Sequence, residues 1–143
     1  MKILNTAAYI SLTVSFVIVG VGIYWLFLPY KLFIYNTSPM KLVNTTVKVG
    51  EDLRYIADYC KYTNKIPISI KRQLVGGYAY DLPVSTSSNF PQGCGKIEVA
   101  LPLYLPSSIK PGRYRVKVTG EYQANPLRTW TYEVYTEEFN LIK

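Results

Sequence analysis

The chain has 143 residues, enough for one domain and an anchoring segment, and its net charge is +7. Histidine is absent, which excludes Ser-His and Cys-His catalytic dyads and removes the commonest general base. Fourteen tyrosines, nine prolines and nine glycines favour strands and turns over helices.

The charges are unevenly distributed along the chain. No charged residue lies between Lys2 and Lys31, and all nine acidic residues lie between Glu51 and Glu138. Fourteen basic residues accompany these nine acids, so the polar part carries a net charge of +5. An anionic partner such as lipid would suit that charge, but the basic residues are scattered, and solubility is the favoured explanation for them. We therefore expect membrane lipid around the apolar segment and no nucleic-acid partner.

The first predicted element is a transmembrane helix at residues 7–30, AAYISLTVSFVIVGVGIYWLFLPY. About 20 apolar residues are enough to cross the hydrocarbon core of a bilayer. The hydroxyls of Ser11, Thr13 and Ser15 can bond back to the helix backbone, and Pro29 should end or kink the helix. Aromatic residues gather at its C-terminal end, where amphipathic rings prefer the membrane interface. These expected interface residues are Tyr24, Trp25, Tyr30, Phe33 and Tyr35.

A cleaved signal peptide is the main alternative to an anchor. Its apolar region would span about 7–15 residues and precede a small-residue cleavage site, and the sequence after residue 30 offers no such site. We predict a short cytoplasmic tail at 1–6, a transmembrane helix with its interfacial collar at 7–35, a linker at 36–41 and a β domain at 42–143. The positive-inside count is nearly tied, and a short tail is most simply left in the cytoplasm. The C-terminal domain is therefore expected to be extracytoplasmic, either periplasmic or extracellular.

Four small residues, Ala8, Ser11, Ser15 and Gly22, fall close to one face of this helix. Such a strip can let a second helix approach closely, as in a homo- or hetero-oligomer. The alternative is that the strip has no function, because small residues are common in membrane helices.

Seven short strands are predicted after the polar break Asn36-Thr37-Ser38-Pro39. Turn signals such as Gly50, Gly76-Gly77 and Asn125-Pro126 separate them. The predicted strands are Leu42–Val49, Leu53–Tyr62, Ile66–Val75, Tyr78–Val84, Lys96–Tyr104, Gly112–Tyr122 and Leu127–Phe139. Glu51–Lys61 could also be a short helix, but its β-rich surroundings favour a strand.

Alternation of apolar and polar residues is clearest in the last two strands, which should form an antiparallel hairpin. Residues expected to point inward are Tyr114, Val116, Val118 and Tyr122, then Trp130, Tyr132 and Val134. Two further alternating sets are Ile66, Ile68 and Ile70, and Ile97, Val99, Leu101 and Leu103. The pattern predicts a sheet with one wet face.

The segment Pro111–Val118, PGRYRVKV, resembles the turn-into-strand element late in immunoglobulin-like and fibronectin type III-like domains. In those domains a Pro-Gly turn precedes a strand whose first inward residue is tyrosine. The resemblance covers this element and the following hairpin only, and it implies a mainly β fold: an antiparallel, immunoglobulin-like β-sandwich of about seven strands. The chain departs from true immunoglobulin domains because neither cysteine lies in this strand.

Cys60 and Cys94 are the two cysteines of the chain. In an extracytoplasmic domain a disulfide between them would stabilise the fold by roughly 3–4 kcal/mol in the chain-entropy model. The alternative is two free thiols in a cytoplasmic domain. Two cysteines without histidine fall short of a structural zinc site, so we expect no metal.

No phosphate-binding loop, dinucleotide fingerprint or calcium loop is present. We therefore expect no catalytic residues, no cofactor and no enzymatic activity. Tyr104 and Tyr135 could contact a partner, and the loop Ser85–Gly95, with Asn89 and Phe90 at its centre, could bind one or could be tucked down by Phe90.

The sequence thus predicts a membrane-anchored accessory or structural protein whose β-sandwich binds another protein. In size and in its single anchor it also resembles, by type, small membrane proteins of bacteriophages and other viruses, so a virion or envelope component is the second hypothesis. The third is a small subunit of a larger membrane complex that docks through its helix.

Overall fold

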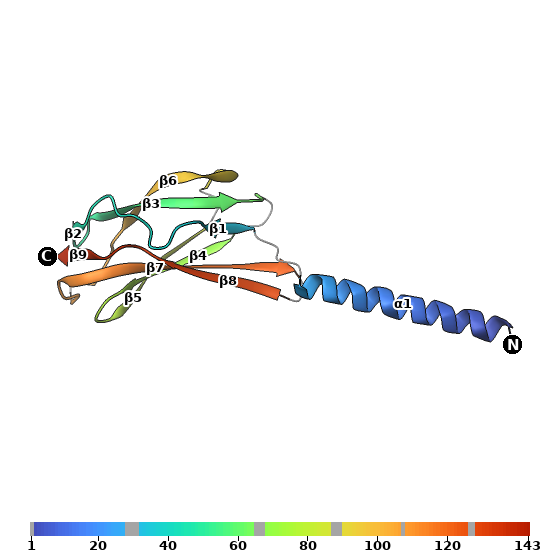
Figure 1. Ribbon diagram of the computed structural model, residues 1–143. Helices are drawn as coiled ribbons and strands as arrows, with labels where there is room; N and C mark the ends of the chain where they lie inside the picture. Colours follow the sequence, from blue (N-terminus) through green and yellow to red (C-terminus); the bar gives the residue numbers. More distant parts are fainter. Residues whose placement is uncertain (1, 28–31, 65–67, 87–89, 107, 126–127) are drawn as a thin grey trace. The chain divides into compact units, whose positions relative to one another are not determined.

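The computed structural model describes residues 2–27, 32–64, 68–86, 90–106, 108–125 and 128–143. One helix, α1 (Lys2–Phe27), precedes nine strands (Figure 1). The strands are β1 (Phe33–Tyr35), β2 (Thr46–Lys48), β3 (Asp52–Lys61), β4 (Ser69–Val75), β5 (Ala79–Thr86), β6 (Gly93–Pro102), β7 (Gly112–Asn125), β8 (Arg128–Tyr135) and β9 (Phe139–Ile142). The prediction of a mainly β chain with one N-terminal helix is confirmed.

The chain divides into two compact units. The first comprises Met1–Tyr30 and Gln123–Thr129, and the second comprises Lys31–Tyr122 and Trp130–Lys143. The helix dominates the first unit, and the second is a β domain.

Helix α1 is long and apolar enough to span a membrane. Its stretch Ala8–Phe27 has a mean hydropathy of 2.1, and none of it is buried inside the protein. The hydroxyls of Thr13 and Ser15 donate to the carbonyls of Tyr9 and Ser11, both at 2.9 Å, so the expected bonding of these side chains to the helix backbone is confirmed. The helix ends at Phe27, and the predicted helix breaker Pro29 lies outside the described residues.

Two polar side chains of the first unit bond the last turn of α1. Asn125 donates through Nδ2 to the carbonyl of Trp25, and Arg128 donates through Nη1 to the carbonyl of Leu26 at 2.9 Å. The last carbonyls of a helix have no partner within the helix. These two side chains supply partners to two of them.

The β domain is built from two facing sheets (Figure 1). The smaller sheet has the strand order β1-β3-β6 and is antiparallel throughout. The larger has the order β2-β9-β7-β4-β5, with β8 also paired to β7. Within it β2 and β9 run parallel, whereas β7 pairs antiparallel with β9 and with β4, and β4 pairs antiparallel with β5.

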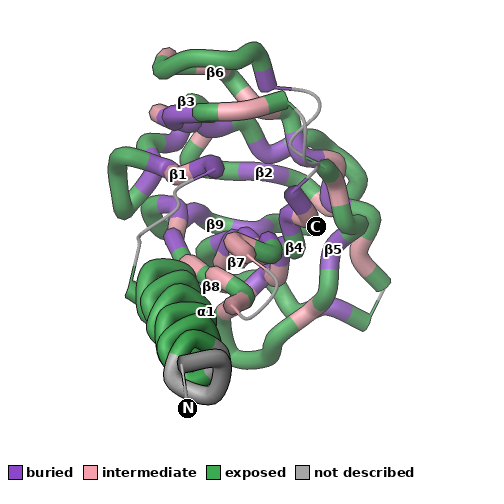
Figure 2. Tube along the Cα trace, turned by 90° about the vertical axis from the view of Figure 1, so that its right-hand side faces the viewer, coloured by how far each residue is buried: buried purple, intermediate pink, exposed green. Residues whose placement is uncertain are grey.

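Buried positions alternate with exposed ones along the strands, as Figure 2 shows. On β7 the side chains of Tyr114, Val116, Val118 and Tyr122 are buried, as the sequence predicted. Leu53, Tyr55, Ala57 and Tyr59 form the matching buried row of β3. The ambiguous segment 51–61 is therefore a strand, because a two-residue period buries one of its faces against the larger sheet.

The structure corrects the prediction of seven strands in two places. The predicted strand Leu127–Phe139 ends earlier than expected, because the chain leaves β8 after Tyr135, and a separate strand, β9, begins at Phe139. The Thr136 hydroxyl accepts from the backbone N–H of Val116 at 2.9 Å, and the Glu137 carboxylate accepts from the N–H of Leu42 at 3.0 Å. Both side chains thus replace ladder bonds where the pairing is interrupted.

The second correction concerns residues 32–41, which were expected to be an interfacial collar and a linker. Residues 33–35 form β1, which pairs with β3, and Met40 and Leu42 make isolated bridges to Thr136 and Tyr55. Phe33 and Tyr35 are buried in the core, so the structure places neither ring at a membrane surface. Their apolar character serves the packing of the β domain. Tyr30 lies outside the described residues.

Candidate binding groove between two sheet edges

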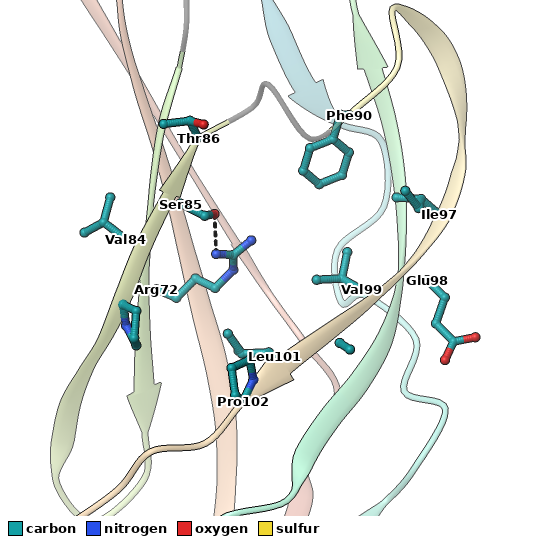
Figure 3. Close-up of a pocket in the computed structure, with 12 residues that line it drawn as sticks. Arg72, Val84, Ser85, Thr86, Phe90, Ile97, Glu98, Val99, Leu101 and Pro102 are labelled. Carbon is teal, nitrogen blue, oxygen red and sulfur yellow. Dashed lines mark hydrogen bonds between the residues drawn. The ribbon is translucent and has the colours of Figure 1, made fainter.

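Strands β5 and β6 are the last strands of their sheets, and a groove of about 290 Å³ lies between them (Figure 3). Apolar side chains from both strands and from the segment before β6 line most of it. They are Pro83, Val84, Phe90, Ile97, Val99, Leu101 and Pro102. On β6 the inward-facing Ile97 and Val99 are only half-buried, because no strand of the described residues continues the smaller sheet on this side.

Two charged residues line the groove: Arg72 of β4, and Glu98 of β6, whose side chain is 51% exposed and pairs with Arg54 at 3.7 Å. Arg72 stands in the inward row of its strand, between Ile70 and Leu74, and its side chain is only 6% exposed. Its Nε donates to the Tyr55 hydroxyl at 3.2 Å, and Nη1 donates to the Ser85 hydroxyl. Figure 3 shows the guanidinium reaching toward the space between Ser85 and Val99, below Phe90.

Arg72 has neutral hydrogen-bond acceptors but no counter-ion in the described part of the chain. No Asp or Glu carboxylate there lies within 4.0 Å of its nitrogens; the four ion pairs found involve Arg54, Lys71, Lys96 and Lys117. Burying a cation is costly unless an anion or several hydrogen bonds compensate for the lost hydration. The guanidinium therefore gives the groove a preference for an anionic group.

Phe90 closes one end of the groove. It is 5% exposed and packs against the rings of Phe33, Tyr35 and Tyr59, with centroid distances of 5.2, 6.2 and 4.9 Å. Of the two expectations for the loop 85–95, the structure therefore supports the one in which Phe90 tucks the loop down. Asn89 lies outside the described residues.

The two edges that border the groove differ in their backbones. On β5 the pairing register shifts, so that Pro83 and Val84 together stand opposite Lys71. A bulge and a proline both hinder the addition of another strand. Strand β6 has ten residues, and its single proline, Pro102, is its last residue.

The hydrogen bonds of β3 show which backbone groups of β6 point to this open edge. The N–H of Ile56 bonds to Lys41 and the N–H of Arg54 bonds to the Asn44 side chain, on the side of β3 away from β6. Alternate residues of a strand bond to opposite neighbours, so Tyr55 bonds to its β6 partner Val99. The N–H and C=O groups of Glu98 and Ala100 consequently face the open edge.

Cys60 and Cys94 form the predicted disulfide. They lie directly opposite each other on β3 and β6, with a Cα–Cα distance of 4.0 Å. By the alternation above this is a non-hydrogen-bonded pair, in which side chains approach most closely. Next to it, the buried Lys61 donates through Nζ to the carbonyl of Phe90 at 2.8 Å, so the disulfide and this bond hold the start of β6 and Phe90 together.

The rings of Tyr35 and Tyr132 are in contact, 6.0 Å between centroids, and Tyr35 also packs against Phe90 at the end of the groove. Burial raises the pKa values of both Tyr35 and Tyr132, and for each of them it is the largest cause. Within the described chain neither hydroxyl makes a hydrogen bond of ordinary geometry, although the nearby Arg72 guanidinium partly opposes the rise in the pKa of Tyr35. These hydroxyls stay protonated, so the region adds no negative charge that could neutralise Arg72.

The remaining predicted site residues do not meet at this groove. Tyr104 is 75% exposed. Tyr135 is half-buried, and Cζ of the Arg115 guanidinium lies over its ring, 4.9 Å from the ring centroid. On α1, Tyr24 and Trp25 are solvent-exposed, as are the small residues Ala8, Ser11 and Ser15, and Gly22 is half-buried. Among the described residues no three metal-ligating side chains cluster.

Arg72 was not singled out from the sequence, although a signal for it exists. The alternation that marks Ile66, Ile68 and Ile70 as inward continues to Arg72 and Leu74. An arginine in an inward row is rarely buried without a partner. The sequence could not show that this position borders an open edge, because strand order determines that.

No protein-family model matches the chain, and no curated protein matches it. Among solved structures it is similar to Pseudomonas fluorescens alkylpurine DNA glycosylase AlkC bound to DNA containing an abasic site analog, with a TM-score of 0.42 and 13% identity. The match covers 80% of this chain and 32% of that one, so this chain spans about a third of that protein's length.

That protein is an enzyme, and this finding contradicts the expectation from the sequence that the chain has no enzymatic activity. The expectation is withdrawn. A TM-score of 0.42 carries no argument about what the chain does, so glycosylase activity is not transferred to it.

Proposed function

We propose that this chain is a single-pass membrane protein that holds its β domain on the extracytoplasmic side, where the domain binds another protein. The observation that carries the proposal is an uncharged, unburied helical stretch, Ala8–Phe27, joined in one chain to a disulfide-closed β domain. Disulfides persist mainly outside the cytoplasm, and the pair Cys60–Cys94 therefore favours that side of the membrane.

We further propose that the β domain is an immunoglobulin-like sandwich. Two facing sheets support this, as does Tyr114 near the start of β7. Its ring is buried and its hydroxyl donates to the carbonyl of Lys110 at 2.8 Å. A tyrosine that bonds back to the backbone a few residues upstream is a recurrent feature of such sandwiches.

Protease accessibility tests the topology. Protease added to intact cells, with the outer envelope made permeable where there is one, should digest the domain after Lys31 and leave a cytoplasmic control intact. Alkylation before lysis, followed by a non-reducing gel, should show both cysteines blocked from modification. A protected domain with two reactive thiols would reverse the proposed orientation.

An anchor exchange tests which part makes the protein contact. Replacing residues 7–30 with an unrelated transmembrane helix should leave the partner in the complex that is isolated from membranes. Loss of the partner after this exchange would instead support docking through the helix, for which the small residues Ala8, Ser11, Ser15 and Gly22 are the candidate surface.

A further inference from the structure

We infer that the groove between β5 and β6 binds an extended segment of the partner protein, which pairs with the open edge of β6 and places an Asp or Glu carboxylate on Arg72. This inference rests on the proposed function, because it assigns the surface and the chemistry of the protein contact.

The charge of the groove selects the ligand class. Arg72 is buried at the groove, its two assigned bonds go to the neutral hydroxyls of Tyr55 and Ser85, and no carboxylate in the described chain lies within ion-pair distance. A carboxylate that enters the groove would supply the missing counter-charge in a partly desolvated place. In such a place a charge-assisted hydrogen bond is stronger than a hydrogen bond between neutral groups.

The backbone of β6 selects an extended peptide over a small anion. The outward N–H and C=O groups of Glu98 and Ala100 form an edge that no described strand pairs with, and such an edge is a ready template for strand addition. The opposite border is blocked by the bulge at Pro83 and Val84. One strand can therefore pair with β6 and fill the groove without pairing with β5.

Size and lining agree with such a segment. From Ile97 to Leu101 the groove wall is five residues long, and an added strand of about five residues, at roughly 3.3 Å each, would follow it. Side chains of a strand alternate, so its inward residues would meet Ile97, Val99 and Leu101 with the acidic residue between apolar ones. We expect a motif with an acidic residue flanked two positions away by apolar residues.

Selection from a library of random seven-residue peptides displayed on phage, against the full chain in lipid nanodiscs, tests this motif. Peptides bound by the unaltered chain should be enriched in Asp or Glu at one position by about tenfold, as expected for a charge-assisted bond. The Arg72→Met variant keeps the aliphatic stem and should lose that enrichment while it keeps the flanking apolar preference. Arg113→Met, at an exposed arginine that does not line the groove, should select as the unaltered chain does.

The edge is tested separately with Ala100→Pro. This change removes an N–H that faces the open edge and leaves the β3–β6 ladder intact, so the variant should fold and lose at least about tenfold in affinity for the selected peptides. The inference is overturned if the peptides selected by the unaltered chain show no enriched acidic position. It is also overturned if the Arg72→Met variant selects peptides with the same acidic position. Unchanged affinity with Ala100→Pro overturns it as well.

A photo-crosslinking residue in native membranes separates this inference from the proposed function. Val84 borders the groove and is 61% exposed, whereas Tyr78 is 62% exposed and does not line it. Adducts with one protein from Val84, reduced by Ala100→Pro, support the inference. Adducts from Tyr78 alone overturn the groove assignment and leave the proposed function standing, and absence of adducts from both positions and from Tyr104 argues against the proposed function itself.

Discussion

Gly120 of β7 lies beneath the ring of Tyr132 of β8, and a Cβ atom added at this glycine would overlap the end of the tyrosine ring. The absence of a side chain at Gly120 thus leaves room for the Tyr132 ring against the neighbouring strand. We predict that Gly120→Ala lowers the free energy of unfolding of the β domain by about 1–3 kcal/mol, the usual cost of overpacking.

Urea unfolding of the full chain in detergent, followed by tryptophan fluorescence, measures this change. Gly77→Ala is the matched control, because a Cβ there meets no atom within 4 Å. Combining Gly120→Ala with Tyr132→Leu should recover part of the loss by removing the overlapping ring atoms. Equal stability of the two single alanine variants would contradict the prediction.

At the scale of elements, the disulfide joins β3 to β6 across 34 residues of sequence. Replacing both cysteines, Cys60→Ala with Cys94→Ala, should lower the free energy of unfolding by roughly 3–4 kcal/mol in the chain-entropy model. The reduced, unaltered chain should unfold at the same urea concentration as the double variant. A difference below about 1 kcal/mol would show that the disulfide restricts the unfolded chain little.

The β strands with a two-residue period were predictable from the sequence, since burial of one face imposes that period on β3, β7 and β8. Strand β1 was missed because Phe33 and Tyr35 follow an apolar helix, and aromatic residues suit both a membrane interface and a β core. The break at Thr136 was missed because it depends on two hydrogen bonds to residues distant in sequence. The N–H of Val116 donates to the Thr136 hydroxyl, and the N–H of Leu42 donates to the Glu137 carboxylate.

The groove was harder to predict from the sequence than the strands were. Its apolar wall appears in the alternation of Ile97, Val99 and Leu101, yet this pattern is the same for a central strand and an edge strand. Whether β6 has a neighbour depends on how the two sheets assemble. The disulfide was predictable as an option from two cysteines in a small domain, and the register of β3 on β6 is what brings them together.

At the scale of the whole β domain, buried tyrosines link its stability to alkaline pH. Burial raises the pKa values of Tyr35 and Tyr132 above the ordinary value of about 10. The folded state therefore holds these phenolic protons more tightly than the unfolded chain does. The associated stability is fully present below pH 10 and is lost as the pH rises above that value toward the folded-state pKa values.

We predict that the free energy of unfolding falls above about pH 10 by up to about 1.4 kcal/mol per pH unit for each of these tyrosines. Urea unfolding at several pH values between 8 and 11 measures the slope, and the double variant Tyr35→Phe with Tyr132→Phe should flatten it. Tyr104→Phe, at an exposed phenol, should leave the slope unchanged. Because both buried hydroxyls lack a partner in the described chain, the double variant should also be at least as stable as the unaltered chain at pH 8; a large loss of stability there would show that these hydroxyls are bonded in the folded domain.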